Sequence, residues 1–336
     1  MKRWLILSML ACMGFTASKA SAQVSEDTLF EAAIQRGISE VYNLEFEKAD
    51  AEFSTLIALQ PRHPAGLFFK GGAIGFEGRL RFHRDEWLAA ANAGRKALPI
   101  VRQASELDPT NYDIALGTGI YHYYADVIPN EYPMVKPLLL FIPSGDRKRG
   151  LRELTLASER GRYASIETTY FLMQIYYTYE RDYAQALRLA ERLRTRFPGN
   201  TLFHKYLGRC HVVMGNYQRA EETFGEILGR VRSGTRGYGP AVEREAAYYL
   251  GFCALQLQRN EEALGYLYRC DELCRTLDTR EASGFMAMAN LKIGMVYDLQ
   301  GRREQAMQQY RKVLSMKSYK DTHTQAERFL QAPYAY

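Results

Sequence analysis

Two consecutive segments of the sequence, residues 167–200 and 201–234, repeat one pattern at a spacing of 34 residues. Counted from the first residue of each segment, positions 8, 11 and 20 are Gln174, Tyr177 and Ala186 in the first segment, and Gly208, His211 and Ala220 in the second. A period of this length fits one supersecondary unit that stacks on its copies. The chain is therefore expected to fold as an array of similar units.

A 34-residue period with small side chains at positions 8 and 20 and bulky ones at positions 11 and 24 resembles the tetratricopeptide repeat. The resemblance implies an all-α fold, a right-handed superhelical solenoid of helix pairs. Because one pair cannot bury its own apolar face, stacking of the pairs supplies the core. Apolar residues make up 47% of the chain, which is enough for such a core.

The register of these two segments extends along the chain in seven units, two of them irregular. The expected bounds are 30–63, 64–111, 112–166, 167–200, 201–243, 244–286 and 287–320, followed by a capping helix at 321–331 and a tail at 332–336. The third unit contains an insertion at 128–144 with Pro129, Pro133, Pro137 and Pro143. Prolines at this spacing predict an irregular segment, because proline cannot continue a helix.

Two interpretations of the proline-containing insertion stay open. Its apolar run, Leu138–Ile142, either folds over the groove of the solenoid and plugs it, or contacts a partner or a membrane surface. A weaker resemblance covers residues 112–170. The order of Gly117 and Gly119, then Pro129, then Gly145-Asp146-Arg147 is similar to divergent tetratricopeptide repeat proteins described as associated with the outer membrane or linked to lipid.

The N-terminus has the pattern of a secretory signal. Lys2 and Arg3 precede a short apolar run, and Ala20-Ser21-Ala22 fits a cleavage site, so residues 1–22 are expected to be removed. Lipidation at Cys12 is the alternative. We expect an exported protein, in the periplasm or associated with the outer membrane. The leader holds three cations and no acid, so the formal charge of +6 falls to +3, which does not favour nucleic acid as a partner.

The remaining cysteines, Cys210, Cys253, Cys270 and Cys274, are interpreted as small buried residues, with disulfides left open. His204 and His211 stand at helix-contact positions, where packing is the expected role. The Gly117-x-Gly119 pair lacks the strand and third glycine of a dinucleotide loop and is interpreted as helix packing. No motif indicates an enzyme, a metal site or a cofactor, and we expect none.

The resemblance implies that positions 2, 5, 9, 12 and 13 of each first helix line a concave groove. The candidate groove residues are Phe68, Phe76, Tyr123, Tyr124, Phe171, Tyr179, Lys205, Arg209, Tyr248 and Phe252. These side chains are mainly aromatic, with a positive spot at Lys205 and Arg209. The groove predicts a scaffold that binds an envelope protein or peptide. The alternatives are a carrier or sensor of an apolar small molecule or lipid, and a groove already filled by neighbouring helices or by the insertion.

Overall fold

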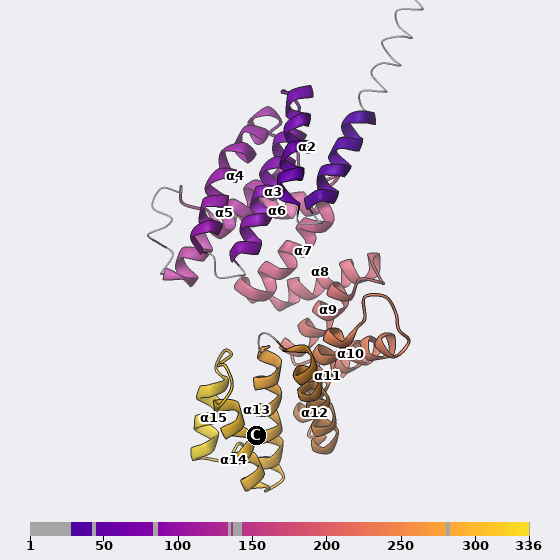
Figure 1. Ribbon diagram of the computed structural model, residues 1–336, viewed down its shortest axis with the longest axis vertical. Coiled ribbons are helices and arrows are strands. Elements are labelled where there is room, and N and C mark those ends of the chain that lie inside the picture. Colours follow the sequence, from indigo (N-terminus) through magenta and orange to yellow (C-terminus); the bar gives the residue numbers. More distant parts are fainter. Residues whose placement is uncertain are drawn as a thin grey trace, which may run out of the picture. The chain divides into compact units, whose positions relative to one another are not determined.

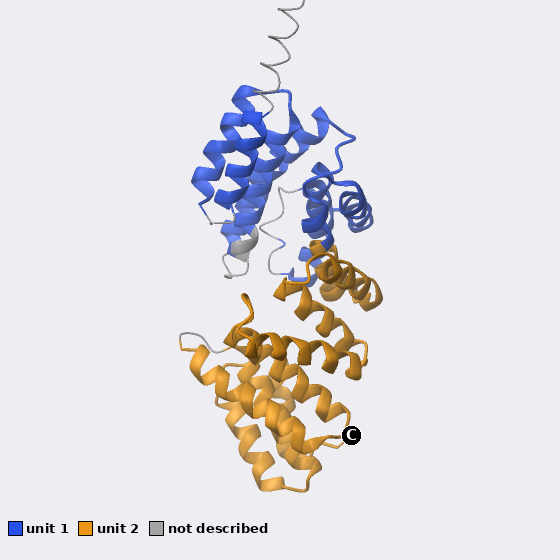
Figure 2. Ribbon diagram, turned by 90° about the vertical axis from the view of Figure 1, so that its right-hand side faces the viewer, with its two compact units in different colours: residues 1–169 blue, residues 170–336 orange. Residues whose placement is uncertain are grey.

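The computed structural model describes residues 28–41, 45–82, 87–133, 136, 143–279 and 283–335. Within these ranges the chain forms helices and connecting turns and no β-strand. Two compact units, Met1–Thr169 and Tyr170–Tyr336, divide the chain (Figure 2). The expected leader at 1–22, with Cys12, lies outside the described residues, so its cleavage stays a prediction.

The first unit is built from sequential helices that pack as neighbours. After a helix at 28–41 come α2 (Phe46–Leu59), α3 (Pro64–Phe82), α4 (Trp87–Leu107), α5 (Ile114–Glu131) and α6 (Arg147–Arg160) (Figure 1). The most extensive contacts in this unit join α3 to α4 and α5 to α6. Helix α7 (Ser165–Ile175) contains the boundary between the two units.

The second unit is also built from sequential helices that pack as neighbours. After α7 it contains a π-helical turn, η2 (Tyr176–Glu180), then α8 (Tyr183–Arg196), α9 (Thr201–Val213), α10 (Tyr217–Arg232), α11 (Pro240–Gln256), α12 (Asn260–Leu277), α13 (Gly284–Leu299), α14 (Arg303–Leu314) and α15 (Thr322–Gln331). Extensive contacts join α9 to α10, α11 to α12 and α13 to α14. The predicted all-α array of helix pairs is confirmed.

In most helix pairs a glycine of the first helix faces a bulky residue of the second. The missing side chain lets the two helices pack closely. A Cβ added at Gly208 would stand 2.6 Å from the ring of Phe224, closer than real side chains approach. The glycine–partner contacts are Gly37–Phe53, Gly71–Val101, Gly119–Leu154, Gly208–Phe224, Gly251–Leu267 and Gly294–Tyr310. In unit 167–200 the sizes are exchanged, since Gln174 stands at position 8 and the fully buried Ala190 at position 24.

The start of the proline-containing insertion differs from the prediction. Helix α5 continues through Pro129 to Glu131, so residues 128–131 are helical, and the expectation that the irregular segment starts at 128 is wrong. Pro129 removes a single backbone donor, and the helix ends two residues later, where the N–H of Tyr132 donates to the carbonyl of Ile128 at 2.8 Å. Residues 134–135 and 137–142 lie outside the described ranges, so the contacts of the apolar run stay a prediction.

After the insertion the chain packs directly on the backbone of α5. The N–H of Asp146 donates to the carbonyl of His122 at 2.9 Å, and the N–H of Arg147 donates to Asp126 Oδ2 at 3.0 Å. A Cβ at Gly145 would stand 2.3 Å from the His122 carbonyl oxygen, and one at Gly150 would stand 2.5 Å from a backbone nitrogen of α5. These glycines therefore permit a close approach of two backbones.

Candidate functional site

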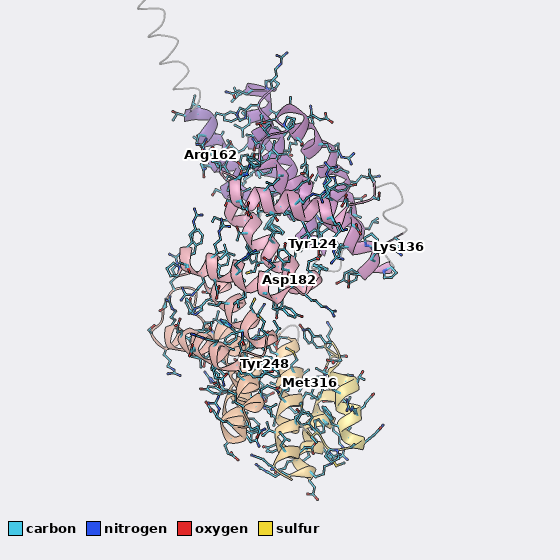
Figure 3. The ribbon with its side chains drawn as sticks, turned by 180° about the vertical axis from the view of Figure 1, so that it is seen from behind. Tyr124, Lys136, Arg162, Asp182, Tyr248 and Met316 are labelled. Atoms are coloured by element: carbon cyan, nitrogen blue, oxygen red, sulfur yellow. The ribbon has the colours of Figure 1, made fainter. Side chains whose placement is uncertain are left out.

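The ten predicted groove residues differ in their burial. Four lie in the core of their own unit with at most 8% of their surface exposed: Phe68, Tyr123, Phe171 and Tyr248. Tyr248, labelled in Figure 3, packs its ring against Tyr249 and Phe285. Six are half-buried: Phe76, Tyr124, Tyr179, Lys205, Arg209 and Phe252. The buried four support the helix stack and offer little surface to a partner.

The predicted positive spot at Lys205 and Arg209 contains an acid as well, Glu245. Lys205 Nζ lies 3.0 Å from Glu245 Oε2, and Arg209 Nε donates to Glu245 Oε1 at 2.6 Å. The Glu245 side chain is only 5% exposed, so the two cations hold a buried carboxylate and the group keeps one net charge. Burial opposes the charge on Arg209, but the interactions with Glu245, Tyr249 and Tyr206 together outweigh that effect, and the pKa of the guanidinium is raised.

A cluster of half-buried tyrosines lies beside this ion network. Gln174 Nε2 donates to the hydroxyl oxygen of Tyr170 at 2.7 Å and to that of Tyr206 at 3.0 Å. The ring of Tyr206 meets the rings of Tyr170 and Tyr177 edge-on, each at 5.9 Å between centroids, and the Arg209 guanidinium lies 5.1 Å from its centroid. We call these five residues, from α7, η2 and α9, the tyrosine face.

Arg209 of the tyrosine face was among the predicted groove residues, but its three tyrosines were not, because they occupy repeat positions 4, 6 and 11. The π-helical turn Tyr176–Glu180 changes the side-chain register at the end of α7, and Arg181 closes it with a left-handed φ of 53°. One signal was present in the sequence. Gln174 replaces the glycine of position 8 while Ala190 replaces the bulky partner, which marks this repeat as different from its neighbours.

A second pairing of a cation with a ring lies on α11 and α13. Lys292 Nζ stands 5.4 Å from the ring centroid of Phe252, which also meets Tyr217 edge-on at 6.1 Å. Burial lowers the pKa of Lys292. Phe252 therefore remains a half-buried aromatic residue with a cation on its face.

The four cysteines and His204, which sequence reasoning considered for other chemistry, are packed inside the second unit. All four of its cysteines are buried, and burial raises the pKa values of Cys210 and Cys253 to about 12, so neither is a ready nucleophile. His204 is 1% exposed, as expected for a packing residue. Among the described residues, His, Cys, Asp and Glu form no group of three or more that could hold a metal ion. None of the described helices is both long and apolar enough to span a membrane.

Comparison with known families matches three parts of the chain. Family models described as tetratricopeptide repeat match residues 177–236, 211–272 and 288–316. These matches cover the paired segments from residue 177 onward and most of the last repeat, 287–320. No curated protein sequence matches the chain.

Solved structures with a similar fold include the apo form of RapI, with a TM-score of 0.59 and 15% identity over 89% of this chain and 80% of RapI. The C-terminal part of a tetratricopeptide repeat protein from Cytophaga hutchinsonii has a TM-score of 0.46 and 12% identity over 87% of this chain and 98% of that part. PilW, a type IV pilus biogenesis factor, has a TM-score of 0.45 and 13% identity over 77% and 96%. At these identities the likeness to RapI shows the fold alone.

Proposed function

Because this chain is a tetratricopeptide repeat protein, a class of protein-binding scaffolds, we propose that it is an exported scaffold that binds a segment of an envelope protein. The contact surface in this proposal is the tyrosine face of the second unit. The observation that supports it most directly is Gln174, whose amide donates to two tyrosine hydroxyls, that of Tyr170 on its own helix and that of Tyr206 on α9.

The composition of the tyrosine face fits a protein-binding surface. Tyrosine and arginine are enriched among the residues that dominate binding energy at protein interfaces. The tyrosine rings of this face are already held in the folded chain by hydrogen bonds and edge-on contacts. Binding would therefore cost little further ordering of side chains. A tyrosine ring with a hydroxyl tip can contact both the apolar side chains and the backbone of an incoming segment.

Two substitutions of Tyr206 test the proposal. Tyr206→Ala removes the central ring, and we expect partner affinity to fall about 30-fold or more, as for truncation of an interface hot spot. Tyr206→Phe keeps the ring and removes the hydroxyl acceptor of Gln174, and should have a smaller effect. Tyr268→Phe is the matched control, because it also removes one tyrosine hydroxyl bond, to Tyr297, on a different helix.

The measurement begins with capture of partners from an envelope fraction by the wild-type protein, identified by mass spectrometry. Affinity for each captured partner is then measured with the three variants. If Tyr206→Ala binds every partner as tightly as the wild type, the tyrosine face is not the binding surface. Release of an apolar small molecule from the wild-type protein in native mass spectrometry, with no protein partner, would instead favour the carrier function.

Export is the second part of the proposal, and the leader pattern at 1–22 supports it. Sequencing the N-terminus of the protein purified from its native cells should give Gln23 as the first residue. A mature chain that starts at a lipidated Cys12 would replace cleavage after Ala22, and a chain that keeps Met1 in the cytoplasm would contradict export.

A further inference from the structure

The tyrosine face offers more hydrogen-bond donors than acceptors to a partner. The hydroxyl oxygen of Tyr206 accepts from Gln174 at 3.0 Å, while its own O–H donates to no group in the part of the chain that the structure describes. The ring of Tyr177 meets Tyr183 and Tyr206, but its hydroxyl makes no hydrogen bond to any described residue. Burial raises the pKa of Tyr177, so this hydroxyl stays protonated and remains a donor.

The ion pairs beside the tyrosine face have the same polarity. Glu245 accepts from Lys205 at 3.0 Å and from Arg209 Nε at 2.6 Å. An ammonium carries three N–H donors, so Lys205 keeps two more, and Arg209 Nη1 donates to none of the described residues. Both carboxylate oxygens of Glu245 are engaged, and its side chain is only 5% exposed. A ligand at this place therefore meets donors and one net positive charge.

A surface of this kind suits a segment whose backbone supplies acceptors only. A helical partner already uses its backbone carbonyls internally, and an extended strand brings N–H groups that would face donors. Proline has no backbone N–H, and a polyproline II segment leaves its carbonyls open. Grooves lined by aromatic side chains are the usual sites that recognise such segments. Hydrogen-bond polarity therefore favours a proline-rich ligand over a helix or a strand.

The spacing of the tyrosine rings fits a polyproline II helix. Tyr170 and Tyr177 are seven residues apart in the sequence, about 10 Å of helix rise. The ring of Tyr206 lies between them, 5.9 Å from each centroid. A polyproline II helix returns to the same side every three residues, about 9 Å along its axis. Prolines three residues apart can therefore pack against Tyr170 and Tyr177, with the carbonyls between them near Tyr206.

On the premise of the proposed function, we propose that the segment bound at the tyrosine face is proline-rich and carries an acidic residue. Its proline rings pack against the tyrosine rings, and its carbonyls accept hydrogen bonds from the hydroxyls of Tyr206 and Tyr177. The acidic side chain of the segment balances the net positive charge beside Glu245, because a carboxylate pairs with the remaining N–H groups of the two cations.

Blocked synthetic peptides test this proposal on the purified wild-type protein. The probe is a nine-residue peptide of prolines with one central glutamate. A second peptide has alanine in place of every proline, and a third has lysine in place of the glutamate. We expect isothermal titration calorimetry to give a dissociation constant at least about tenfold lower for the probe than for either of the other peptides.

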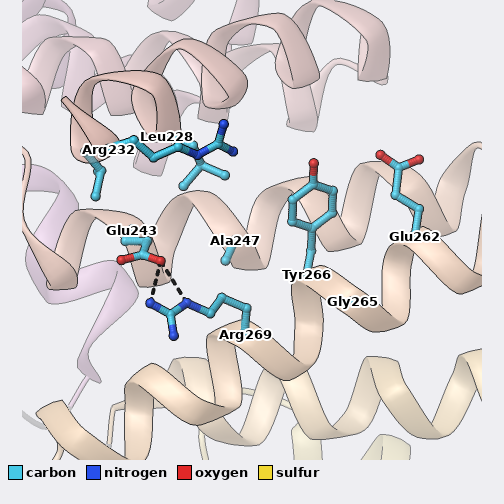
Figure 4. A pocket seen from close by; sticks show the side chains of 9 residues that line it. Leu228, Arg232, Glu243, Ala247, Glu262, Gly265, Tyr266 and Arg269 are labelled. Carbon is cyan, nitrogen blue, oxygen red and sulfur yellow. Dashed lines mark hydrogen bonds and ion pairs between the residues drawn. The ribbon is translucent and has the colours of Figure 1, made fainter.

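Variants of the protein locate the bound peptide. Tyr206→Ala should raise the dissociation constant of the probe at least about tenfold, and Tyr206→Phe should raise it less, because the ring is kept. Tyr266→Ala is the matched control and should leave binding unchanged. Tyr266 is also a half-buried tyrosine, but it lies on α12 in a hollow of about 580 Å³ that Leu228 and Ala247 line as well (Figure 4). Circular dichroism shows that each variant folds.

The outcomes separate this proposal from the proposed function. Preference for the probe that Tyr206→Ala abolishes and Tyr266→Ala keeps supports it. A probe that binds no tighter than the alanine or the lysine peptide overturns it. So does a probe that binds Tyr206→Ala as tightly as the wild type, or that Tyr266→Ala weakens equally. In those cases an envelope partner whose capture depends on Tyr206 would still support the proposed function, and only the chemistry of its segment would be wrong.

Discussion

Two adjacent glycines of α3, Gly71 and Gly72, should differ in how replacement by alanine changes stability. A Cβ at Gly71 would stand 2.6 Å from Val101 Cγ2, whereas a Cβ at Gly72 has no heavy atom of the described chain within 4 Å. We therefore expect Gly72→Ala to stabilise the first unit and Gly71→Ala to destabilise it relative to Gly72→Ala. Since both sites lie in one helix, the comparison cancels the effect of helix propensity.

The magnitude follows from two opposing contributions. Replacing a helix-interior glycine by alanine gains about 1 kcal/mol at either site. At Gly71 the new methyl group overlaps Val101, because carbon atoms normally approach to only about 3.5–4.0 Å. Val101 has little freedom to move, since a helical valine has one favoured rotamer and Gly117 of α5 closes its other side. Overpacking of this kind costs about 1–3 kcal/mol, which is the expected difference between the two variants.

Stability is best measured locally, by native-state hydrogen exchange of the amides of α3 and α4, because the two units need not unfold together. A third variant, Val101→Ala, removes the methyl groups that clash. In that background Gly71→Ala should become favourable, with a coupling energy of about 1–3 kcal/mol in the double-mutant cycle. The reasoning is refuted if Gly71→Ala raises protection as much as Gly72→Ala does in the wild-type background.

Two other predictions concern pH and backbone packing. Burial, with the nearby charges of Arg194 and Arg230, lowers the pKa of His204 to about 3 from about 6.5 in the unfolded chain. Because the unfolded state then binds one more proton, stability is lost as pH falls from about 6.5 to about 3. Between pH 6.5 and pH 4.5, the free energy of unfolding measured in urea should fall by about 2–3 kcal/mol more for the wild type than for His204→Gln. Equal falls for the two proteins would contradict the lowered pKa of His204. Gly145→Ala should lower the protection of the amides of α5 and α6 from hydrogen exchange by about 1–3 kcal/mol, because its Cβ would meet helix backbone, whereas Gly94→Ala, in open space, should not.

Much of the fold could be predicted because the repeat is a local pattern. The glycine at position 8 and the bulky residue at position 24 lie within one helix pair, so a short stretch of sequence, such as Gly208 to Phe224, already specifies their contact. The proline rule failed at Pro129 because one proline removes a single backbone donor, and α5 continues to Glu131 despite that loss.

The candidate site could be predicted only in part. The sequence pointed to aromatic residues on the first helices of the pairs, but not to which of them keep exposed surface. Tyr248 and Tyr206 both lie on first helices, yet one is enclosed by Tyr249 and Phe285 while the other remains half-buried beside Gln174. That difference depends on side chains of the neighbouring pairs, which the register of a single repeat does not specify.

The sequence by itself determined the repeat length, the helix pairs and the exchange of sizes at Gln174 and Ala190, because these depend on spacing along one chain segment. Only the tertiary structure decided that Lys205 and Arg209 share the carboxylate of Glu245, 40 and 36 residues away. The charge that a surface presents is the sum over all groups that meet there, and stacking of successive repeats brings those groups together. The tyrosine face arises in the same way.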